Sequence, residues 1–128
     1  MVRMPDVTAT VPTRRMSVAR GTLLLPKGFV PDADAIAAAR SAAVLAAKET
    51  ARLLPTAVPF QVTDASCEVD AQSAHVECTM TVQGFARTVL ASAALLGASA
   101  ALVSLAESAG SPEGTRISEL HVVQNVAD

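Results

Sequence analysis

The sequence is poor in aromatic residues, in charge and in cysteine. Among 128 residues there is no Trp or Tyr, there are three Phe and two Cys, and charged residues make up 17%. A net charge of -2 provides no basic face for a nucleic acid or an anionic membrane, so we expect neither partner. Two cysteines match neither a disulfide framework nor a zinc pattern. Residues 1–13 lack the apolar core of a signal peptide, which predicts a cytoplasmic protein.

Apolar residues, by contrast, make up 51% of the chain, and alanine is the commonest of them. This fraction excludes a disordered chain and predicts one soluble domain over residues 1–128, with residues 1–14 as an extended N-terminal segment. Alanine buries little area, so the core of a domain this size is thin. We therefore expect a homo-oligomer.

The run from Thr88 to Ala106 contains no charge and is nearly long enough to span a bilayer. It consists mostly of Ala, Ser and Gly, it lacks flanking Trp and Tyr, and Arg87 and Glu107 adjoin it. We predict a helix buried between protein surfaces, in which small residues allow close approach of another helix, and no membrane span.

Periodicity predicts six elements along the chain. Asp32 and Asp34 stand where the N-cap and first-turn acid of a helix belong, and apolar residues then recur every three to four positions up to Pro55. The other elements are strands at Met16–Leu25, Phe60–Asp70, His75–Gly84 and Thr115–Gln124, and a helix at Ala86–Ala109. This order predicts an α+β, ferredoxin-like βαββαβ fold, a four-stranded antiparallel sheet with two helices on one face.

Few side chains point to chemistry. His121 is predicted to share a strand face with Ile117 and Glu119, where it could act as a general base or be a hydrogen-bonded structural residue. Cys67 and Cys78 are predicted to lie opposite each other on the apolar face of a hairpin, without a neighbouring cation, as inert packing thiols. No phosphate loop, nucleophile elbow, metal cluster or dinucleotide motif is present, and we expect no metal and no cofactor.

The first helix carries a stripe of residues four apart: Arg40, Val44, Lys48 and Arg52. These cations could hold an anionic group at a subunit junction. Alternatively, they form a solvated stripe whose late cations suit the helix dipole. The sequence pattern does not decide between an anion-binding stripe and a solvated one.

The stretch A-R-S-A-A-V-L-A-A-K-E-T (39–50), followed by L-L-P (53–55) and V-P-F (58–60), resembles the molybdenum cofactor biosynthesis protein C (MoaC) family, the cyclic pyranopterin monophosphate synthases. Family members read A-R-x-A-G-I-x-A-A-K-x-T and then L-I-P-L-C-H-P-L. The resemblance implies the same ferredoxin-like fold and an oligomer built from dimers. Family positions retained in this chain are Arg15, Asp34, Arg40, Lys48 and Thr50.

Other residues of the family motifs are missing. The histidine of L-C-H-P-L is Val58, and the lysine of K-G-D is Asp32. The two glutamates of T-G-V-E-M-E-A fall on Leu90 and Ser92, and the terminal G-G-K-S-G is absent. These losses remove groups suited to a triphosphate and to proton transfer, so we expect no synthase reaction.

The substitutions turn an inherited pocket from polar to apolar, which favours an apolar small-molecule substrate. Our leading hypothesis is a cofactor-independent cyclase, isomerase or lyase in a specialised biosynthetic pathway, with its site near Thr56–Phe60 and the start of the second helix, completed by a neighbouring subunit. The alternatives are a catalytically inert binding or partner subunit, and residual synthase activity. The candidate catalytic residues are His121, Lys48 and Arg40, and the candidate substrate-binding residues are Val58, Phe60, Leu90, Arg15, Asp34 and Thr50.

Overall fold

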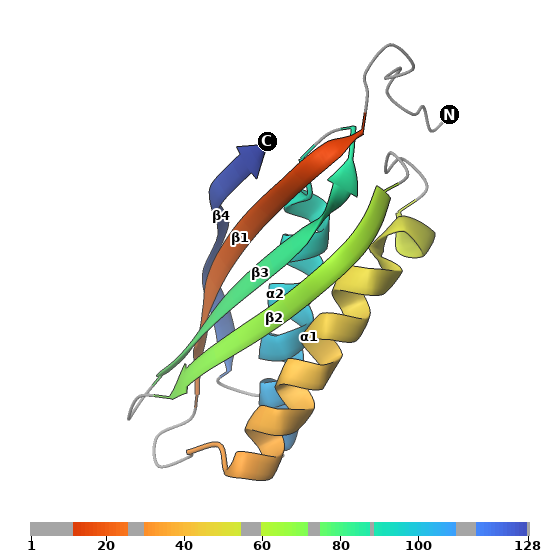
Figure 1. Cartoon of the computed structure of the whole chain (residues 1–128). Helices are drawn as coiled ribbons and strands as arrows, with labels where there is room; N and C mark the ends of the chain where they lie inside the picture. Colours follow the sequence, from red (N-terminus) through yellow and green to blue (C-terminus); the bar gives the residue numbers. More distant parts are fainter. Residues whose placement is uncertain are drawn as a thin grey trace, which may run out of the picture.

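The chain folds into a four-stranded sheet with two helices packed on one face (Figure 1). The computed structural model describes residues 12–25, 30–54, 60–71, 75–87, 89–109 and 115–127. The elements are β1 (Thr13–Leu24), α1 (Ala33–Leu53), β2 (Phe60–Ala71), β3 (His75–Ala86), α2 (Ala91–Ser108) and β4 (Arg116–Ala127). The strands are antiparallel in the order β2-β3-β1-β4. The predicted ferredoxin-like α+β fold is confirmed.

Helix α1 begins where the sequence predicts. The Asp32 carboxylate accepts a hydrogen bond from the backbone N–H of Ala35 at 2.8 Å, which satisfies a free N–H of the first turn. Asp34 supplies the expected first-turn acid. The buried side of the helix consists of Ala39, Ala43, Ala47 and Thr50. Its small side chains let α1 lie close to the sheet and to α2.

Helix α2 begins at Ala91, five residues later than the predicted Ala86. Strand β3 continues through Ala86 because that residue pairs with Thr13 of β1 on one side and with Phe60 of β2 on the other. Strand β1 correspondingly begins at Thr13, so Thr13 and Arg14 belong to the sheet and not to an extended N-terminal segment. Of the hairpin turn predicted at residues 71–74, Ala71 is instead the last residue of β2, and residues 72–74 lie outside the described residues.

The core lies between the sheet and the helices. Val76, Cys78, Met80 and Val82 of β3 point inward and are fully buried, as the alternating pattern predicts. At Gly97 of α2, an added Cβ would lie 3.1 Å from the carbonyl oxygen of Ala43 on α1. The small residues of α2 therefore do allow the close helix contact that was predicted, and the neighbour is α1 of the same chain.

Within the described part of the chain, α2 is the one helix long and apolar enough to cross a membrane. Length and composition alone do not distinguish such a span from a core helix. In this fold α2 packs on α1 and on β1, β3 and β4. Its buried residues are Ala93, Ala94, Gly97, Ala98, Ala101, Leu102 and Leu105. It is therefore a core helix of the domain.

Candidate functional site

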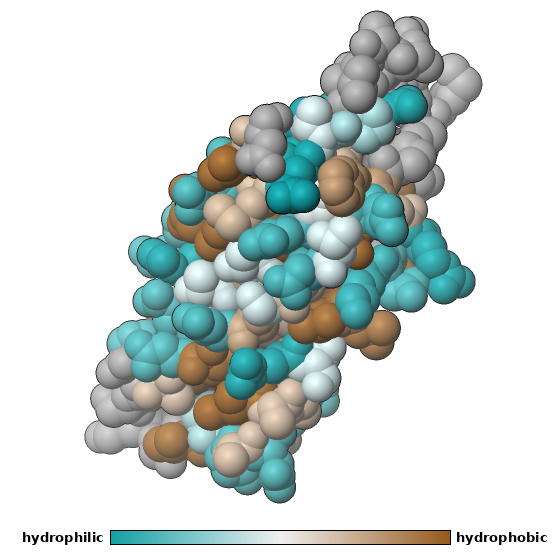
Figure 2. Space-filling model, in the orientation of Figure 1, coloured by the Kyte–Doolittle hydropathy of each residue, from teal (hydrophilic) through white to brown (hydrophobic). Residues whose placement is uncertain are grey.

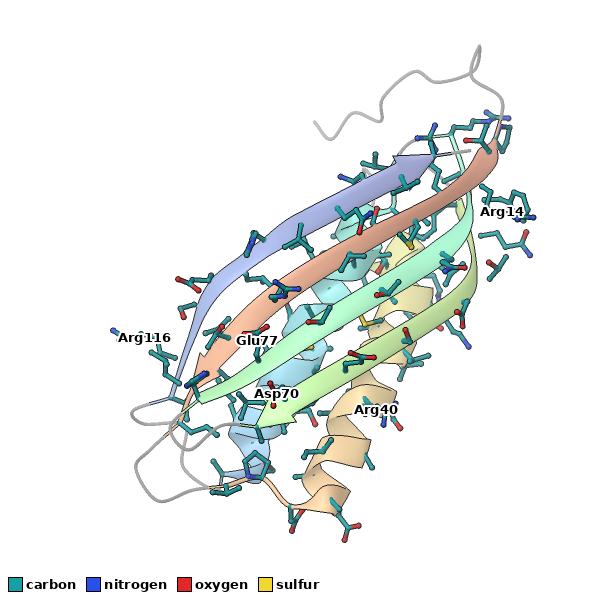
Figure 3. The ribbon with its side chains drawn as sticks, turned by 60° about the vertical axis from the view of Figure 1, so that its left-hand side comes forward. Arg14, Arg40, Asp70, Glu77 and Arg116 are labelled. Carbon is teal, nitrogen blue, oxygen red and sulfur yellow. The ribbon has the colours of Figure 1, made fainter. Side chains whose placement is uncertain are left out.

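A groove of about 550 Å³ lies between α1 and β2, the strand at one edge of the sheet. This volume falls within the range of roughly 300 to 1,000 Å³ that is typical of small-molecule sites. The groove is lined by Ala37, Arg40, Ser41, Val44 and Leu45 of α1 and by Ala65, Ser66 and Cys67 of β2. Figure 3 shows Arg40 on α1 beside β2, far from Arg14 at the start of β1.

Arg40 is the cation of this groove. Its Nε donates a hydrogen bond to the carbonyl oxygen of Cys67 at 2.9 Å, and its side chain remains exposed. Among the described residues, the guanidinium has no second hydrogen-bond or ion-pair partner. Two terminal nitrogens of a positioned guanidinium are suited to a planar anion such as a carboxylate. Arg40 can therefore bind an anionic group at the groove.

The rest of the groove is largely apolar. Ala37, Val44, Leu45 and Ala65 supply hydrocarbon surface, and the Leu45 side chain is 62% exposed. Ser41 of α1 and Ser66 of β2 border the groove from its two sides. By contrast, polar and apolar side chains are interspersed over the face of the sheet away from the helices (Figure 2). The groove thus combines apolar walls with the Arg40 guanidinium.

Cys67 forms part of the groove lining and contacts a second thiol. Both cysteines are free and buried, and the Cys67 and Cys78 Sγ atoms lie 3.2 Å apart. They share the inward face of the hairpin as predicted. The prediction that they lie directly opposite was wrong, because Cys67 pairs with Met80 and Cys78 pairs with Val69. The two thiols are diagonal neighbours.

The surroundings of the two thiols push their pKa values apart. The hydrogen bond from Cys78 is the main cause that lowers the pKa of the Cys67 thiol, and the positive charge of Arg40 adds to it, against burial and the charge of Glu68. The pKa of the Cys78 thiol is raised by its hydrogen bond to Cys67 and by burial. The expectation of no neighbouring cation was wrong. Arg40 comes from α1, 27 residues earlier, so no local pattern indicated it.

Of the other cations predicted on α1, Lys48 is exposed and lies eight residues from Arg40, which is about 12 Å along a helix. Arg52 is also exposed and pairs with Glu49 at 3.0 Å. Of the four-residue stripe, Arg40 and Val44 line the groove. The stripe is therefore part solvated surface and part groove wall.

Two retained family positions on α1 lie far apart. Asp34 is exposed in the first turn, whereas Thr50 is fully buried and its hydroxyl donates to the carbonyl oxygen of Ala46 at 2.8 Å. Sixteen residues separate them, about 24 Å along a helix. One small molecule does not contact both side chains in the same chain. Thr50 has a structural role in this fold.

Arg15 lies at the end of the sheet where β3 finishes. Its Nε and Nη2 donate to the carbonyl oxygens of Ala86 and Arg87, at 3.1 and 3.4 Å. These bonds satisfy carbonyls that leave the sheet ladder. Arg15 also borders a smaller hollow of about 280 Å³, together with Arg14, Met16, Gln83 and Val126. It is not part of the α1–β2 groove.

Only some residues of the predicted apolar pocket near Thr56–Phe60 lie within the described part of the chain. Leu90, at the N-terminus of α2, is fully buried in the core, and Phe60 is half-buried and packs against the same core. Val58 lies in the range 55–59, outside the described residues. Leu90 is therefore packed interior at this end of the molecule, and the groove with Arg40 lies elsewhere.

His121 lies on β4, at the edge of the sheet opposite β2. The prediction that it shares a face with Ile117 was wrong, since Ile117 pairs with the buried Leu23 and His121 pairs with the exposed Arg20. A bulge at Glu119, with φ of 56°, changes the alternation between them. The His121 Nδ1 lies 2.5 Å from the carbonyl oxygen of Glu119, a backbone group and not a carboxylate. His121 is not brought together with Arg40 or Lys48.

The comparisons with known proteins agree with the fold. The MoaC family model matches residues 4–126. A probable cyclic pyranopterin monophosphate synthase of Aeropyrum pernix is 37% identical over 110 residues, which are 80% of this chain and 75% of that protein. A probable synthase of the same name from Methanosphaerula palustris is 32% identical over 143 aligned positions, covering 98% of this chain and 92% of that protein. The synthase of Novosphingobium aromaticivorans is 31% identical over 111 residues, 80% of this chain and 71% of that protein.

The match extends over nearly the whole described sheet and both helices, from the start of β1 to the last residues of β4. The alignment with the Methanosphaerula protein is 15 positions longer than the 128 residues of this chain, so that relative has segments without a counterpart here. The aligned region nevertheless includes α1 and β2, the helix and strand that form the groove. The chain belongs to the MoaC family.

Proposed function

We propose that this MoaC-family protein binds an apolar small molecule with an anionic end in the α1–β2 groove and promotes its cyclisation or isomerisation in a specialised biosynthetic pathway. The observation that carries the proposal is the Arg40 guanidinium, fixed by its bond to Cys67 at the edge of an apolar groove. A carboxylate of the ligand would take the terminal nitrogens of Arg40. The hydrocarbon part would cover Val44, Leu45 and Ala65.

Catalysis in this proposal depends on positioning. A flexible chain anchored at one end and confined along α1 loses conformational freedom before it reacts, which raises the rate of an intramolecular step. Lys48, about 12 Å from Arg40 along the helix, would contact the far end of a longer substrate. His121 would take part only through a neighbouring subunit of a homo-oligomer.

The relatives are named as cyclic pyranopterin monophosphate synthases, so the most direct alternative is that reaction. The positions at which this chain departs from the family motifs argue against it. Val58, Asp32, Leu90 and Ser92 stand where motif residues with proton-transfer or cationic groups are expected. Leu90 is moreover fully buried in the hydrophobic core. A hydrocarbon in that position neither donates nor accepts a proton.

A second candidate function is a catalytically inert subunit that pairs with another family member. The observation in its favour is β4, an edge strand whose Val123 and Val126 side chains are 40% and 43% exposed. An unpaired strand edge with exposed apolar residues is a surface for pairing with another chain. Co-purification with an intact family member, in place of self-association, would favour this candidate.

Binding of matched acids and amides tests the proposal. The wild-type protein is titrated in a calorimeter with octanoate and 4-phenylbutyrate, and with their neutral amides. The comparison separates the contribution of the ligand's charge to binding from that of its hydrocarbon part. We expect the carboxylates to bind about tenfold to hundredfold more tightly than the amides, since a charged hydrogen bond contributes about 1.5 to 3 kcal/mol.

Arg40→Gln should remove this preference, whereas Arg52→Gln should keep it. Arg52 supplies the same charge on the same helix, pairs with Glu49 and does not line the groove. Equal binding of acids and amides to the wild-type protein, or equal losses in the two variants, would refute the proposal.

A further inference from the structure

The Cys67 and Cys78 sulfurs lie closer together than packing alone requires. Their Sγ atoms are 3.2 Å apart on adjacent strands, and neither sulfur has another hydrogen-bond partner among the described residues. A disulfide bond is about 2.05 Å long, so the sulfurs need to approach by only about 1 Å. Diagonal neighbours on adjacent strands have Cα atoms about 7 to 8 Å apart, so bond formation also draws the edge strand β2 slightly toward β3.

The two thiols are also inequivalent in charge. The hydrogen bond between the two sulfurs and the charge of Arg40 both lower the pKa of the Cys67 thiol and so favour its thiolate. The same hydrogen bond and burial raise the pKa of the Cys78 thiol, which is fully buried. An acidic thiol beside a protonated one is the arrangement of an attacking cysteine and its resolving partner.

Cys67 is the member of the pair that a small oxidant can reach. It borders the α1–β2 groove, with Arg40 and Ser66 beside it, although its side chain is only 2% exposed. Cys78 lies behind it, beneath the helices, with no exposed surface. A reagent the size of hydrogen peroxide therefore meets Cys67 first.

We propose that Cys67 and Cys78 form a reversible thiol–disulfide site that reacts with hydroperoxides. The Cys67 thiolate attacks one peroxide oxygen; an S–O bond forms, the O–O bond breaks, and the departing hydroxide takes up the proton that Cys67 released. The Cys78 sulfur then attacks the Cys67 sulfenic acid; the S–S bond forms, the S–O bond breaks, and the second hydroxide takes the Cys78 proton. Two thiols and one hydrogen peroxide yield one disulfide and two waters, and an external dithiol reverses the change.

The proposed reaction of this pair does not require that the groove bind the ligand of the proposed function. The disulfide would tie the edge strand β2 to β3 at the floor of the groove, next to the carbonyl oxygen that Arg40 contacts. Oxidation would also remove the thiolate that Arg40 favours. The redox state of the pair is thereby coupled to Arg40, the cation among the described lining residues of the groove.

The test uses the native wild-type protein and hydrogen peroxide. Intact mass spectrometry should show the loss of two hydrogen atoms, reversed by dithiothreitol, and peptide mapping should show a Cys67–Cys78 disulfide within one chain. In Cys78→Ser, dimedone should label Cys67, whereas in Cys67→Ser the remaining thiol should stay unmodified. Arg40→Gln should slow the oxidation about threefold to tenfold, because a neighbouring cation increases the thiolate fraction. Arg52→Gln should react as the wild type does.

The wild-type protein decides the question even if a cysteine variant does not fold. An unchanged mass in the native protein, under conditions that oxidise the urea-unfolded chain, would overturn the proposal. Disulfides formed only between chains, or equal labelling of Cys67 and Cys78 in the two single variants, would also overturn it.

Discussion

Arg40 and Cys67 hold the middle of α1 against the edge of the sheet. The Arg40 Nε donates to the Cys67 carbonyl oxygen at 2.9 Å, and both residues line the same groove. The bond sets the position of the guanidinium, and the same guanidinium favours the Cys67 thiolate. One contact between residues 27 apart thus places a positive charge at the groove and contributes to the reactivity of the Cys67 thiol.

The first prediction is that the chain does not replace a cyclic pyranopterin monophosphate synthase. Val58 and Leu90 stand in place of a motif histidine and glutamate, so proton transfer at these positions is lost. Expression in a strain that lacks the authentic synthase should restore no molybdenum-cofactor-dependent growth. A relative from the same family serves as the positive control, and rescue by this chain would contradict the prediction.

The second prediction concerns the close approach of β2 and β3 at Gly84. An added Cβ would lie 2.1 Å from the carbonyl oxygen of Gln61, where the register of β2 shifts between Val62 and Asp64. Gly84→Ala should therefore lower the free energy of unfolding by about 3 kcal/mol or more, because backbone has to move. Urea denaturation measures the change.

Gly21→Ala is the matched control for this variant. Its added Cβ would meet the ends of the Leu102 and Leu120 side chains at 2.9 and 3.0 Å, and flexible side chains can shift. We expect a loss of about 1 kcal/mol. A smaller effect at Gly84 than at Gly21 would show that the described register of β2 is wrong.

Most of the fold could be predicted because the signals are local. The N-cap at Asp32 and the alanine spacing of α1 fix that helix, and alternation assigns the inward residues of β3. The end of β3 could not be predicted, since the pairing of Ala86 with Thr13 joins residues far apart in sequence. Pairing of this kind leaves no local pattern.

The sequence predicted individual residues of the candidate site but not the contacts between them. Arg40 stands out through the cationic stripe and the family resemblance, but its partner Cys67 lies on another element. The face of His121 was misassigned because the bulge at Glu119 places a non-glycine residue in the left-handed region, which the sequence does not indicate. Alternation fails wherever a bulge adds a residue.

The third prediction is the pH dependence of Cys67 alkylation. The pKa of the Cys67 thiol is lowered, so its thiolate persists at lower pH than that of an ordinary cysteine, and iodoacetamide should react with a midpoint on the acidic side of the ordinary value. Cys78→Ala removes the main cause and should move the midpoint to higher pH. Arg40→Gln removes a smaller cause and should move it less. A midpoint unaffected by Cys78→Ala would contradict this account of the pair.

The fourth prediction is self-association. The core is rich in small side chains, and the edge strand β4 leaves Val123 and Val126 exposed. We expect light scattering at micromolar concentration to give a multiple of the 13.1 kDa chain mass. A homogeneous species at the mass of one chain would contradict the expectation, as would association that requires another protein.

The most direct test of the account is where an apolar acid binds. Titration of isotope-labelled protein with octanoate, followed by backbone amide shifts, should perturb residues of the α1–β2 groove, above all Arg40, Ser66 and Cys67, while octanamide should produce much smaller shifts there. Arg52→Gln should reproduce the wild-type map. Shifts confined to the end of the sheet around Arg15 and Phe60, or no saturable shifts at all, would contradict the claim that this groove is the binding site.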